Sequence, residues 1–467
     1  MLELGCASGG NLLPLAARWP EARFLGVDLS ARQVADGNRR VRYFHLENVT
    51  LEKADLADLS LPARSFDYVI CHGVFSWVPP TVQGAILRLI GHCLGDSGVA
   101  AISYNVLPGW HLRNPVKDIL RFYARTDGNI RERVARARAA LAALGALTGP
   151  GAYGALLRTE ARQLAKIPSS YILGEFLAEH NHPIQSLDFL TAAAEHGLEF
   201  ICEADLDAGA RSALTREGVH YVERLAKNDL LRASQELDFL SGRPFRRTLL
   251  RKRSASRSPA LPSAAYLSGL HMAARLNPDP KGTSDGGVTY VDRHGHRVST
   301  RLPIIAKALA RLSQAYPATL SVAALLGDSG SAQARIAQTL LELVCRGGAV
   351  LSALPIEVGR ETDPRPKVWN FARAEAAMGL PGVTSLHHVT VALPRIGAAI
   401  ATMSDGTRSS TELASWLAAE IAARRVPLPE QVSSDADAND VLGLAKRHVA
   451  ETLGHLADSA VLAPGAP

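Results

Sequence analysis

Short apolar runs alternate with helical periods through roughly the first 125 residues of the chain. The runs that predict strands are Leu2–Leu4, Arg23–Asp28, Val49–Lys53, Phe66–Cys71 and Val99–Tyr104. Between them a 3.6-residue period predicts helices over Leu12–Arg18, Ser30–Leu46 and Thr81–Leu94, with Ser30 and Thr81 as N-caps. This alternation predicts an α/β fold, a doubly wound parallel sheet with its ligand at the carboxyl ends of the strands.

The hydrophobic pattern changes after this region. It is helical from Asn114 to about Ala194, with a Thr-Gly-Pro-Gly break at 148–151. Two further strands are predicted over Leu198–Glu203 and Phe245–Leu250. We expect these two strands to return to the first sheet as a terminal antiparallel hairpin. The helices of residues 125–195, which precede the hairpin in the sequence, are then an insertion.

The remainder of the chain predicts smaller α+β units. Arg251–Ala264 is rich in Ser, Pro and Arg and predicts a linker. A hairpin is predicted over Gly287–Thr300, with its turn at Asp292–Gly295. Helices followed by a short strand pair are predicted over 302–354, and three more helices are predicted over 395–463. Two winged-helix-like units fit this order. The predicted domains are therefore 1–125 (a nucleotide-type core), 126–250 (helices with returning strands), 251–264 (linker) and 265–467 (winged-helix-like).

Composition narrows the class of protein. The chain has 467 residues, 47% of them apolar and 21% charged, which is ordinary for a globular protein of several domains. The net charge of +6 is a weak argument for nucleic acid at this length. The five cysteines are scattered without a CxxC pair, which argues against a disulfide framework and a zinc site. With no leader pattern and no long apolar run, we expect a cytoplasmic protein without a membrane segment or a metal.

The run ELGCASGG at residues 3–10 carries the first chemical signal. Gly5, Gly9 and Gly10 form a small-residue turn between a strand and a helix, where the backbone can approach a ligand closely. The turn nearly fits a dinucleotide fingerprint and also fits the looser turn of an S-adenosylmethionine site. Asp28 ends the second strand about 20 residues later, where a ribose-binding carboxylate belongs in either case. A packing turn with Asp28 as a helix cap is the alternative.

Two later features separate these interpretations. Asp55 and Leu56 follow the third strand, where a carboxylate can accept from an adenine amino group while Leu56 packs on the ring. Asp55 alone could equally be a surface turn residue. The fourth strand, FDYVIC at 66–71, has the "FDxV" order that is typical of class I methyltransferases and not of dehydrogenases. The ordered set favours S-adenosylmethionine as the cofactor.

Residues 1–125 thus resemble a class I S-adenosylmethionine-dependent methyltransferase. The segments CHGVFSWVP (71–79) and SYNVLPGW (103–110) are similar to a bacterial subgroup with a methyltransferase regulatory domain, which includes rickettsial-type protein lysine methyltransferases. So are GEFL (174–177), GLEF (197–200) and LDFL (237–240) followed by RPFRRTLL (243–250). About 250 residues match well, and Ala7 replaces the glycine that is commonest in the first motif.

The resemblance implies a set of site residues. It places the methionine part of the cofactor on the glycine turn, ribose on Asp28, adenine beside Asp55, and the transferred methyl group toward His72 and the Tyr104–Asn105 segment. The candidate cofactor residues are Glu3, Gly5, Gly9, Gly10, Asp28, Asp55, Leu56 and His72; the candidate catalytic residues are His72, Tyr104 and Asn105; the candidate walls of the acceptor pocket are Phe75, Trp77 and Trp110.

Methyl transfer mainly requires a nucleophile aligned with the sulfonium methyl group. A lysine must also lose its proton, which costs about 4.6 kcal/mol at pH 7 for a pKa of about 10.4. Aromatic walls can lower that pKa by desolvation and hold a cation. Phe75 and Trp77 could equally be core residues. His72 could accept a proton, bind the cofactor's carboxylate or hydrogen-bond its own loop.

We therefore expect methyl transfer to a protein side chain, and the first candidate is lysine. The alternatives are a methyltransferase that acts on a small molecule and a non-catalytic protein that senses the cofactor. The order of Asp55 and the FDYV strand argues against an NAD-binding oxidoreductase. A run of basic residues without acidic ones lies near the last predicted strand. We interpret it as a solvated strand edge and linker, in preference to a contact for RNA or an acidic protein. Its members are Arg243, Arg246, Arg247, Arg251, Lys252, Arg253 and Arg257. Mixed charge on the C-terminal helices favours protein contact or a homodimer over DNA. Related enzymes usually have helices before the first strand, so either the true start lies upstream or the C-terminal domains cover the site.

Overall fold

The computed structural model describes residues 1–125, 127–205, 213–254, 263–279, 287–327, 330–426 and 438–465. The chain divides into two compact units. The first comprises residues 1–12, 22–39 and 48–260, and the second comprises 13–21, 40–47 and 261–467.

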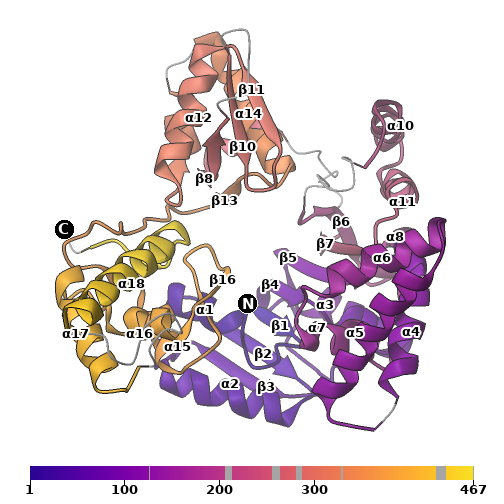
Figure 1. Ribbon diagram of the computed structural model, residues 1–467. Coiled ribbons are helices and arrows are strands. Elements are labelled where there is room, and N and C mark those ends of the chain that lie inside the picture. The colour runs from indigo at the N-terminus through magenta and orange to yellow at the C-terminus, as the bar shows by residue number, and fades with distance from the viewer. Residues whose placement is uncertain are drawn as a thin grey trace. The chain divides into compact units, whose positions relative to one another are not determined.

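The first unit is built around a seven-stranded sheet in the order β3-β2-β1-β4-β5-β7-β6 (Figure 1). Its strands are β1 Leu2–Leu4, β2 Phe24–Asp28, β3 Val49–Lys53, β4 Phe66–Cys71, β5 Leu94–Asn105, β6 Leu198–Glu203 and β7 Phe245–Lys252. β1 to β5 are parallel, whereas β7 runs antiparallel to both β5 and β6. This confirms the predicted α/β sheet and the return of the last two strands to its edge.

Helices connect and follow these strands in the chain, with residues 13–18 of α1 and 40–43 of α2 assigned to the second unit. They are α1 Leu12–Arg18, α2 Ala31–Tyr43, α3 Pro80–Cys93, α4 Asn114–Ala124, α5 Ile130–Leu147, α6 Ala152–Leu164, α7 Ser169–Glu175, α8 Ser186–Glu195, α10 Arg216–Ala226 and α11 Leu230–Ser241, with 3-10 turns η1 Phe75–Trp77 and η2 Gly109–Arg113. α4 to α7 share an apolar core that includes Leu120, Leu141 and Phe176. The break predicted at 148–151 separates α5 from α6.

Local chemistry sets several helix ends. Ser30 caps α2 by accepting from the Gln33 amide at 3.4 Å, as predicted. The cap predicted at Thr81 is wrong, because α3 begins one residue earlier with Pro80, whose fixed φ suits the first helical position. α11 ends at Ser241 and is capped by Gly242, where a φ of 62° favours glycine.

Two predicted strands are shorter than the observed ones. β5 begins at Leu94, five residues before the predicted start, because it continues directly from the end of α3. β7 extends through Arg251 and Lys252, which were predicted to lie in the linker; Arg251 instead pairs with Glu199 on β6. Residues 255–262 of the predicted linker lie outside the described residues.

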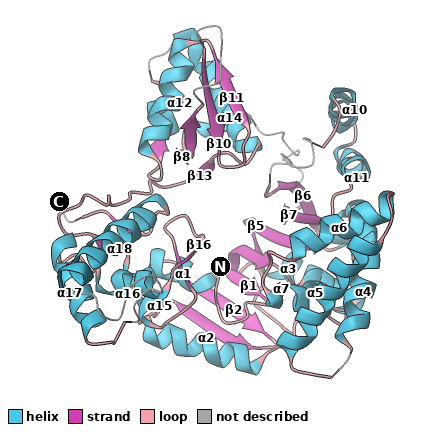
Figure 2. Ribbon diagram, viewed as in Figure 1, coloured by secondary structure: helices cyan, strands magenta, loops and turns pink. Residues whose placement is uncertain are grey.

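The second unit contains small sheets and helices (Figure 2). Its strands are β8 His271–Ala273, β9 Leu276–Pro278, β10 Val288–Asp292, β11 Arg297–Thr300, β12 Leu320–Ser321, β13 Val350–Ser352, β14 Lys367–Val368, β15 Gly382–Thr384, β16 Thr390–Ala392 and β17 Leu462–Ala463. Its helical elements are η3 Ala264–Leu267, α12 Pro303–Ala315, α13 Val322–Leu326, η4 Gly330–Ala332, α14 Gln333–Cys345, α15 Asn370–Ala377, α16 Arg395–Met403, α17 Ser410–Ala422 and α18 Ala438–Asp458.

Two apolar cores organise these C-terminal elements, one around Met272, Leu309 and Leu340 and one around Ile400, Leu417 and Val449. The hairpin predicted over 287–300 is present as β10 and β11. The strand pair predicted at the end of 302–354 is not formed there: β13 pairs with β8, a strand from before the helices. None of the described helices is long and apolar enough to cross a membrane.

Candidate cofactor and acceptor site

The turn after β1 is fixed by backbone hydrogen bonds to the neighbouring strand. The amides of Gly5 and Cys6 both donate to the Val27 carbonyl, at 2.8 and 3.0 Å. Gly5 has a φ of 76°, and a Cβ there would lie 2.2 Å from Cγ2 of Val74. Only glycine satisfies both conditions at this position. At Gly10, by contrast, a Cβ would meet nothing within 4 Å, so the turn is open on that side.

Asp28 ties the glycine turn to the start of α2. Its Oδ2 accepts from the Ala7 amide at 2.8 Å and its Oδ1 from the Ser30 amide at 2.8 Å. A carboxylate oxygen can accept two hydrogen bonds, so each oxygen keeps the capacity for another donor. Ala7 has a φ of 49°, the left-handed conformation that suits the glycine commonest there.

Glu3 is the unusual side chain of this turn. It is only 5% exposed, its Oε1 accepts from Asn11 Nδ2 at 3.1 Å, and its buried Oε2 has no hydrogen-bond partner. Desolvation raises its pKa to about 7, and the hydrogen bond from Asn11 opposes this only in part. A buried carboxylate oxygen beside a glycine turn is suited to a cationic donor.

Asp55 and Leu56 follow β3, as predicted. Asp55 is exposed, and its Oδ1 accepts from the Ala57 amide at 2.9 Å. Leu56 is buried in the core of the sheet. The pair therefore places an exposed carboxylate next to a buried apolar side chain. The Ala54 amide, which donates to the Asp28 carbonyl at 3.1 Å, links the pair to the end of β2.

The exits of β4 and β5 are joined by side-chain hydrogen bonds that the sequence did not predict. Ser103 Oγ accepts from the Gly73 amide at 2.8 Å, and Ser76 Oγ accepts from the Asn105 amide at 2.8 Å. Asn105 Nδ2 also donates to Asn181 Oδ1 at 3.2 Å, and its carbonyl accepts from the Ile184 amide at 3.1 Å. Asn105 is thus a junction between both strand exits and the segment that precedes α8.

His72 lies at the exit of β4. The residue is exposed, but its ring lies 6.2 Å from that of Phe245 in an edge-on arrangement. Desolvation lowers its pKa, and the charge of Arg247 lowers it further. Both effects favour the neutral imidazole, in which one ring nitrogen is a hydrogen-bond acceptor.

Tyr104 does not present its hydroxyl to solvent. It is 1% exposed, its ring stacks on Phe189 at 3.9 Å, and its hydroxyl lies 3.0 Å from Thr248 Oγ1. Burial raises the pKa of the phenol well above its usual range. This geometry favours a positioning role for Tyr104 over contact with a substrate.

The predicted aromatic walls differ in exposure. Phe75 and Trp110 are buried, and Trp77 is partly exposed. The rings of Trp77 and Trp110 meet edge-on at 6.3 Å, so aromatic groups from both strand exits come together. The Arg113 guanidinium lies 5.4 Å from the Trp110 ring and interacts with it as a cation. Phe75 packs against Tyr104 and Phe189, which fits the alternative that it is a core residue.

The basic run of β7 departs from the prediction of a solvated strand edge. β7 lies between β5 and β6 and is not at the edge of the sheet, and Arg246 is fully buried among carboxylates. The prediction failed because the sequence does not show the partners of Arg246. Glu203 lies far from it in the sequence, and Asp238 lies on another element, α11. Arg257 lies outside the described residues.

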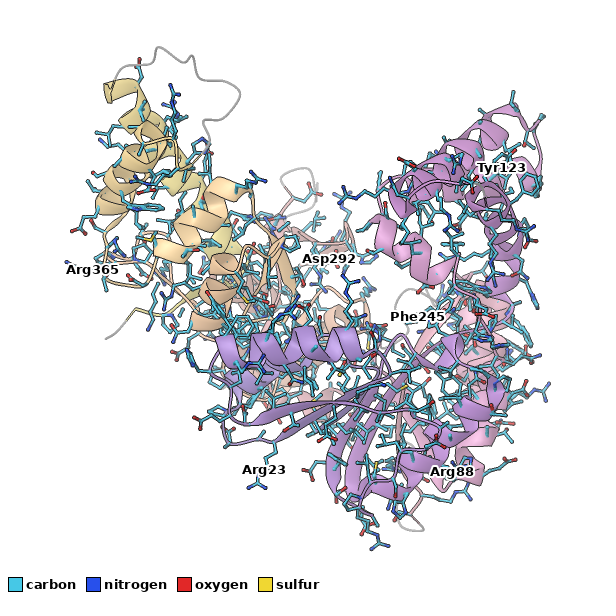
Figure 3. The ribbon with its side chains drawn as sticks, turned by 90° about the horizontal axis from the view of Figure 1, so that it is seen from below. Arg23, Arg88, Tyr123, Phe245, Asp292 and Arg365 are labelled. Carbon is cyan, nitrogen blue, oxygen red and sulfur yellow. The ribbon has the colours of Figure 1, made fainter. Side chains whose placement is uncertain are left out.

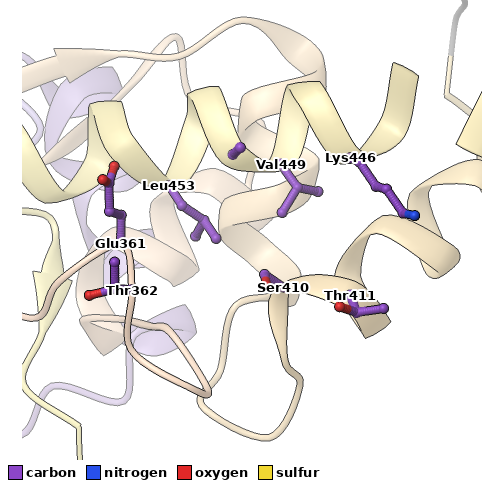
Figure 4. A pocket seen from close by; sticks show the side chains of 8 residues that line it. Glu361, Thr362, Ser410, Thr411, Lys446, Val449 and Leu453 are labelled. Carbon is purple, nitrogen blue, oxygen red and sulfur yellow. The ribbon is translucent and has the colours of Figure 1, made fainter. Parts of the chain in front are cut away.

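The described residues of the second unit form at least two pockets, and no predicted site residue lines either of these two. One, of about 340 Å³, is formed by the start of α17, α18 and residues Glu361 and Thr362 (Figure 4). The other, of about 390 Å³, includes Arg275, Arg293 and His387 in its lining. In the described part of the chain no group of three or more His, Cys, Asp or Glu side chains is arranged to hold a metal ion.

A parallel sheet with an antiparallel last hairpin, a glycine turn after β1 and a carboxylate at the end of β2 define a class I methyltransferase fold. Family models agree with this class: a methyltransferase domain matches residues 1–98, a predicted methyltransferase regulatory domain matches 168–252, and a PKMT C-terminal winged helix domain matches 364–461.

Individual relatives point the same way. Uncharacterized protein RP789 of Rickettsia prowazekii is 36% identical over 54% of this chain, and uncharacterized protein RP028 of the same organism is 35% identical over 39% of this chain and 73% of its own length. The structure of PKMT2 from Rickettsia typhi in complex with AdoHcy has a TM-score of 0.85 at 23% identity and covers 99% of this chain and 93% of that one. It shows the same fold.

The chain belongs to the class I methyltransferases that carry a methyltransferase regulatory domain, in one family with RP028. The matched part covers only 45% of the length of RP789. The predicted family and fold are thereby confirmed.

Proposed function

We propose that the protein transfers a methyl group from S-adenosylmethionine to a protein side chain, and that the acceptor atom is a lysine Nε. The observation that carries the proposal is Glu3, a buried carboxyl with one unpartnered oxygen at a glycine turn. PKMT2 of Rickettsia typhi binds AdoHcy on the same fold, which supports a related ligand here.

The residues of the turn fit this cofactor. In our proposal the unpartnered oxygen of Glu3 accepts from the cofactor's ammonium group, and the open side of the turn at Gly10 leaves room for its methionine part. The spare acceptor capacity of Asp28 suits two ribose hydroxyls. Exposed Asp55 beside Leu56 suits the adenine amino group and ring. Gly5 and Gly9 keep the backbone close enough for these contacts.

When bound, the cofactor supplies an electrophilic sulfonium methyl group. The protein then has to present a neutral amine to it. His72 is a weak base for this purpose: moving a proton from a lysine of pKa about 10.4 to an ordinary histidine of about 6.5 is uphill by about 5 kcal/mol. The lowered pKa of His72 increases that difference. We therefore assign His72 the task of orienting the amine, while desolvation near Trp77 and Trp110 favours its neutral form.

The remaining candidates have supporting roles in this proposal. Asn105 holds the exits of β4 and β5 against the segment around Asn181, and Tyr104 fixes the end of β5 from its buried side. Trp110 is buried with Arg113 over its ring, so we place only its edge toward the acceptor. A cytoplasmic location and a homodimer stay predictions.

Calorimetry tests the cofactor, and labelling tests the acceptor. The full chain is titrated with S-adenosylmethionine, S-adenosylhomocysteine and NAD; we expect the first two to bind, and binding of NAD alone would overturn the proposal. Methyl-labelled S-adenosylmethionine is then added to a lysate that is separated into protein and small-molecule fractions. Label in small molecules alone would favour the small-molecule alternative, and binding without transfer would favour a cofactor sensor.

A further inference from the structure

A buried ion cluster lies where β6, β7 and α11 meet. Arg246 donates to both oxygens of Asp238 at 2.9 and 3.1 Å, to Glu203 Oε1 at 2.7 Å and to the Ser234 carbonyl at 2.8 Å. Thr248 donates to Glu203 Oε1 at 2.8 Å. We call Glu203, Asp238, Arg246 and Thr248 the Arg246 network. All four are buried, and three of them are completely inaccessible.

Stability alone is a weak reason for such a network. Taking an ion out of water is costly, and well-packed apolar residues of the same volume often stabilise a core as well or better. The charges are nearly balanced: two carboxylates face the Arg246 guanidinium, and Arg243 lies 3.7 Å from Glu203. Buried ion networks of this kind are best supported as devices that set register.

The register of β7 matters because its two faces have different partners. Arg246 and Thr248 lie on the side of Tyr104, whose hydroxyl is 3.0 Å from Thr248. Successive side chains of a strand alternate between faces, so Phe245 and Arg247 lie on the other side. There the Phe245 ring, labelled in Figure 3, lies 6.2 Å from that of His72, and the charge of Arg247 acts on His72. A slip of one residue would exchange the two sets.

The network is also bonded directly to the strand that it would hold. Glu203 Oε2 accepts from the Arg247 backbone amide at 3.2 Å, and β7 pairs with β5 so that Phe245 lies opposite Asn105. Glu203, Asp238 and Arg246 all lie in the stretch that matches the regulatory domain. His72 and Asn105 belong to the strand exits of the methyltransferase core.

We infer that Glu203 and Arg246 are positioning residues: they fix β7 so that Phe245 is held against His72 with Arg247 on the same side of the strand, which links the regulatory domain to the acceptor side of the site. This inference rests on the proposed function for its effect on turnover. Its effect on His72 does not depend on that function.

The decisive variant is Glu203→Gln, which keeps the shape of the side chain and leaves Arg246 paired with Asp238, so the buried guanidinium keeps a carboxylate partner. The matched control is Glu199→Gln, which weakens the ion pair to Arg251 between the same two strands at their other end. Both variants are compared with the wild type by NMR titration of His72, by calorimetry with S-adenosylmethionine and by transfer of labelled methyl groups to lysate protein.

We expect Glu203→Gln to move the His72 titration midpoint and to lower kcat about tenfold, since a misplacement of about 1 Å can cost about a hundredfold and we expect a smaller displacement here. Cofactor affinity should stay within about twofold because Glu3 and Asp28 share no partner with the network. Glu199→Gln should leave all three readouts unchanged. Equal effects of both variants would mean that the network only holds the strands together, and would overturn the inference.

Thr248→Val provides a second test that adds no charge change. It removes the bonds to Glu203 and Tyr104, and we expect a displacement of the His72 resonances with cofactor binding retained. Unchanged His72 resonances in both Thr248→Val and Glu203→Gln would contradict the inference. If the wild-type chain fails to bind S-adenosylmethionine while the His72 changes occur as expected, the proposed function fails and the positioning role stands.

Discussion

Replacing Glu3 by Gln should make the first unit more stable at high pH while it weakens cofactor binding. Gln has the same shape and can keep the bond from Asn11, but it cannot ionise. Burial raises the pKa of Glu3 from an ordinary value of 4.5 to about 7. Ionising Glu3 in the folded protein is therefore costlier than in the unfolded chain by about 3 kcal/mol.

The direction in which stability changes with pH follows from the number of protons that Glu3 binds in the folded and the unfolded state. Between pH 4.5 and about 7 the folded protein holds more protons at Glu3 than the unfolded chain, so rising pH destabilises the wild type across this window. Above pH 7 the loss is complete. The variant lacks this loss, and its stability relative to the wild type should rise by about 2 to 3 kcal/mol between pH 5 and pH 8.

Hydrogen exchange of the amides of β1 measures this locally, which avoids treating a chain of two units as one cooperative transition. Opening free energies of the wild type, Glu3→Gln and the control Glu52→Gln, an exposed residue of β3, are compared at both pH values after correction for intrinsic exchange. A difference between Glu3→Gln and the wild type that does not change with pH would show that Glu3 is not desolvated, and would refute the reasoning.

Further predictions concern other residues of the site. Arg247→Gln should raise the pKa of His72 in an NMR titration, because a nearby cation is removed. An unchanged midpoint would show that the charge of Arg247 does not affect His72. Asp28→Ala should lower S-adenosylmethionine affinity by about a hundredfold or more, at about 1.5–3 kcal/mol for each charged hydrogen bond, and calorimetry with unchanged affinity would contradict the ribose assignment. Tyr104→Phe should reduce methyl transfer no more than about fivefold, since the variant loses one hydrogen bond of about 1 kcal/mol. A hundredfold loss in a folded variant would mean that the phenol takes part in the reaction.

The local geometry around the candidate cofactor residues could be predicted from the sequence because its signals are local, and the binding of the cofactor by these residues stays a prediction. The glycine turn, Asp28 and Asp55 each follow a strand at short, fixed spacing, and the structure places Asp28 against the turn through the Ala7 amide. Backbone constraints at Gly5 are a property of a few neighbouring residues. The parallel order of β1 to β5 follows from the same alternation of apolar runs and helical periods.

The acceptor side could not be predicted because its partners are distant in sequence. Tyr104 was predicted to face the methyl group, but β5 is covered by β7 and α8, which turns its hydroxyl to Thr248, 144 residues away. Arg246 belonged to a run of arginines typical of a solvated edge. It is buried because β7 pairs between β5 and β6 and because α11 covers it with Ser234 and Asp238. Ser76 and Ser103 carried no signal beyond a small polar residue near a strand exit.

The central claim is methyl transfer from S-adenosylmethionine to protein lysine, and one measurement tests it most directly. The full chain is incubated with methyl-labelled S-adenosylmethionine and lysate protein, the protein is hydrolysed to amino acids, and the labelled residue is identified. We predict label in Nε-methylated lysine, with the signal strongly reduced in Glu3→Gln and Asp28→Ala. Label confined to small molecules or to another amino acid, or no transfer by a chain that binds the cofactor, would contradict the claim.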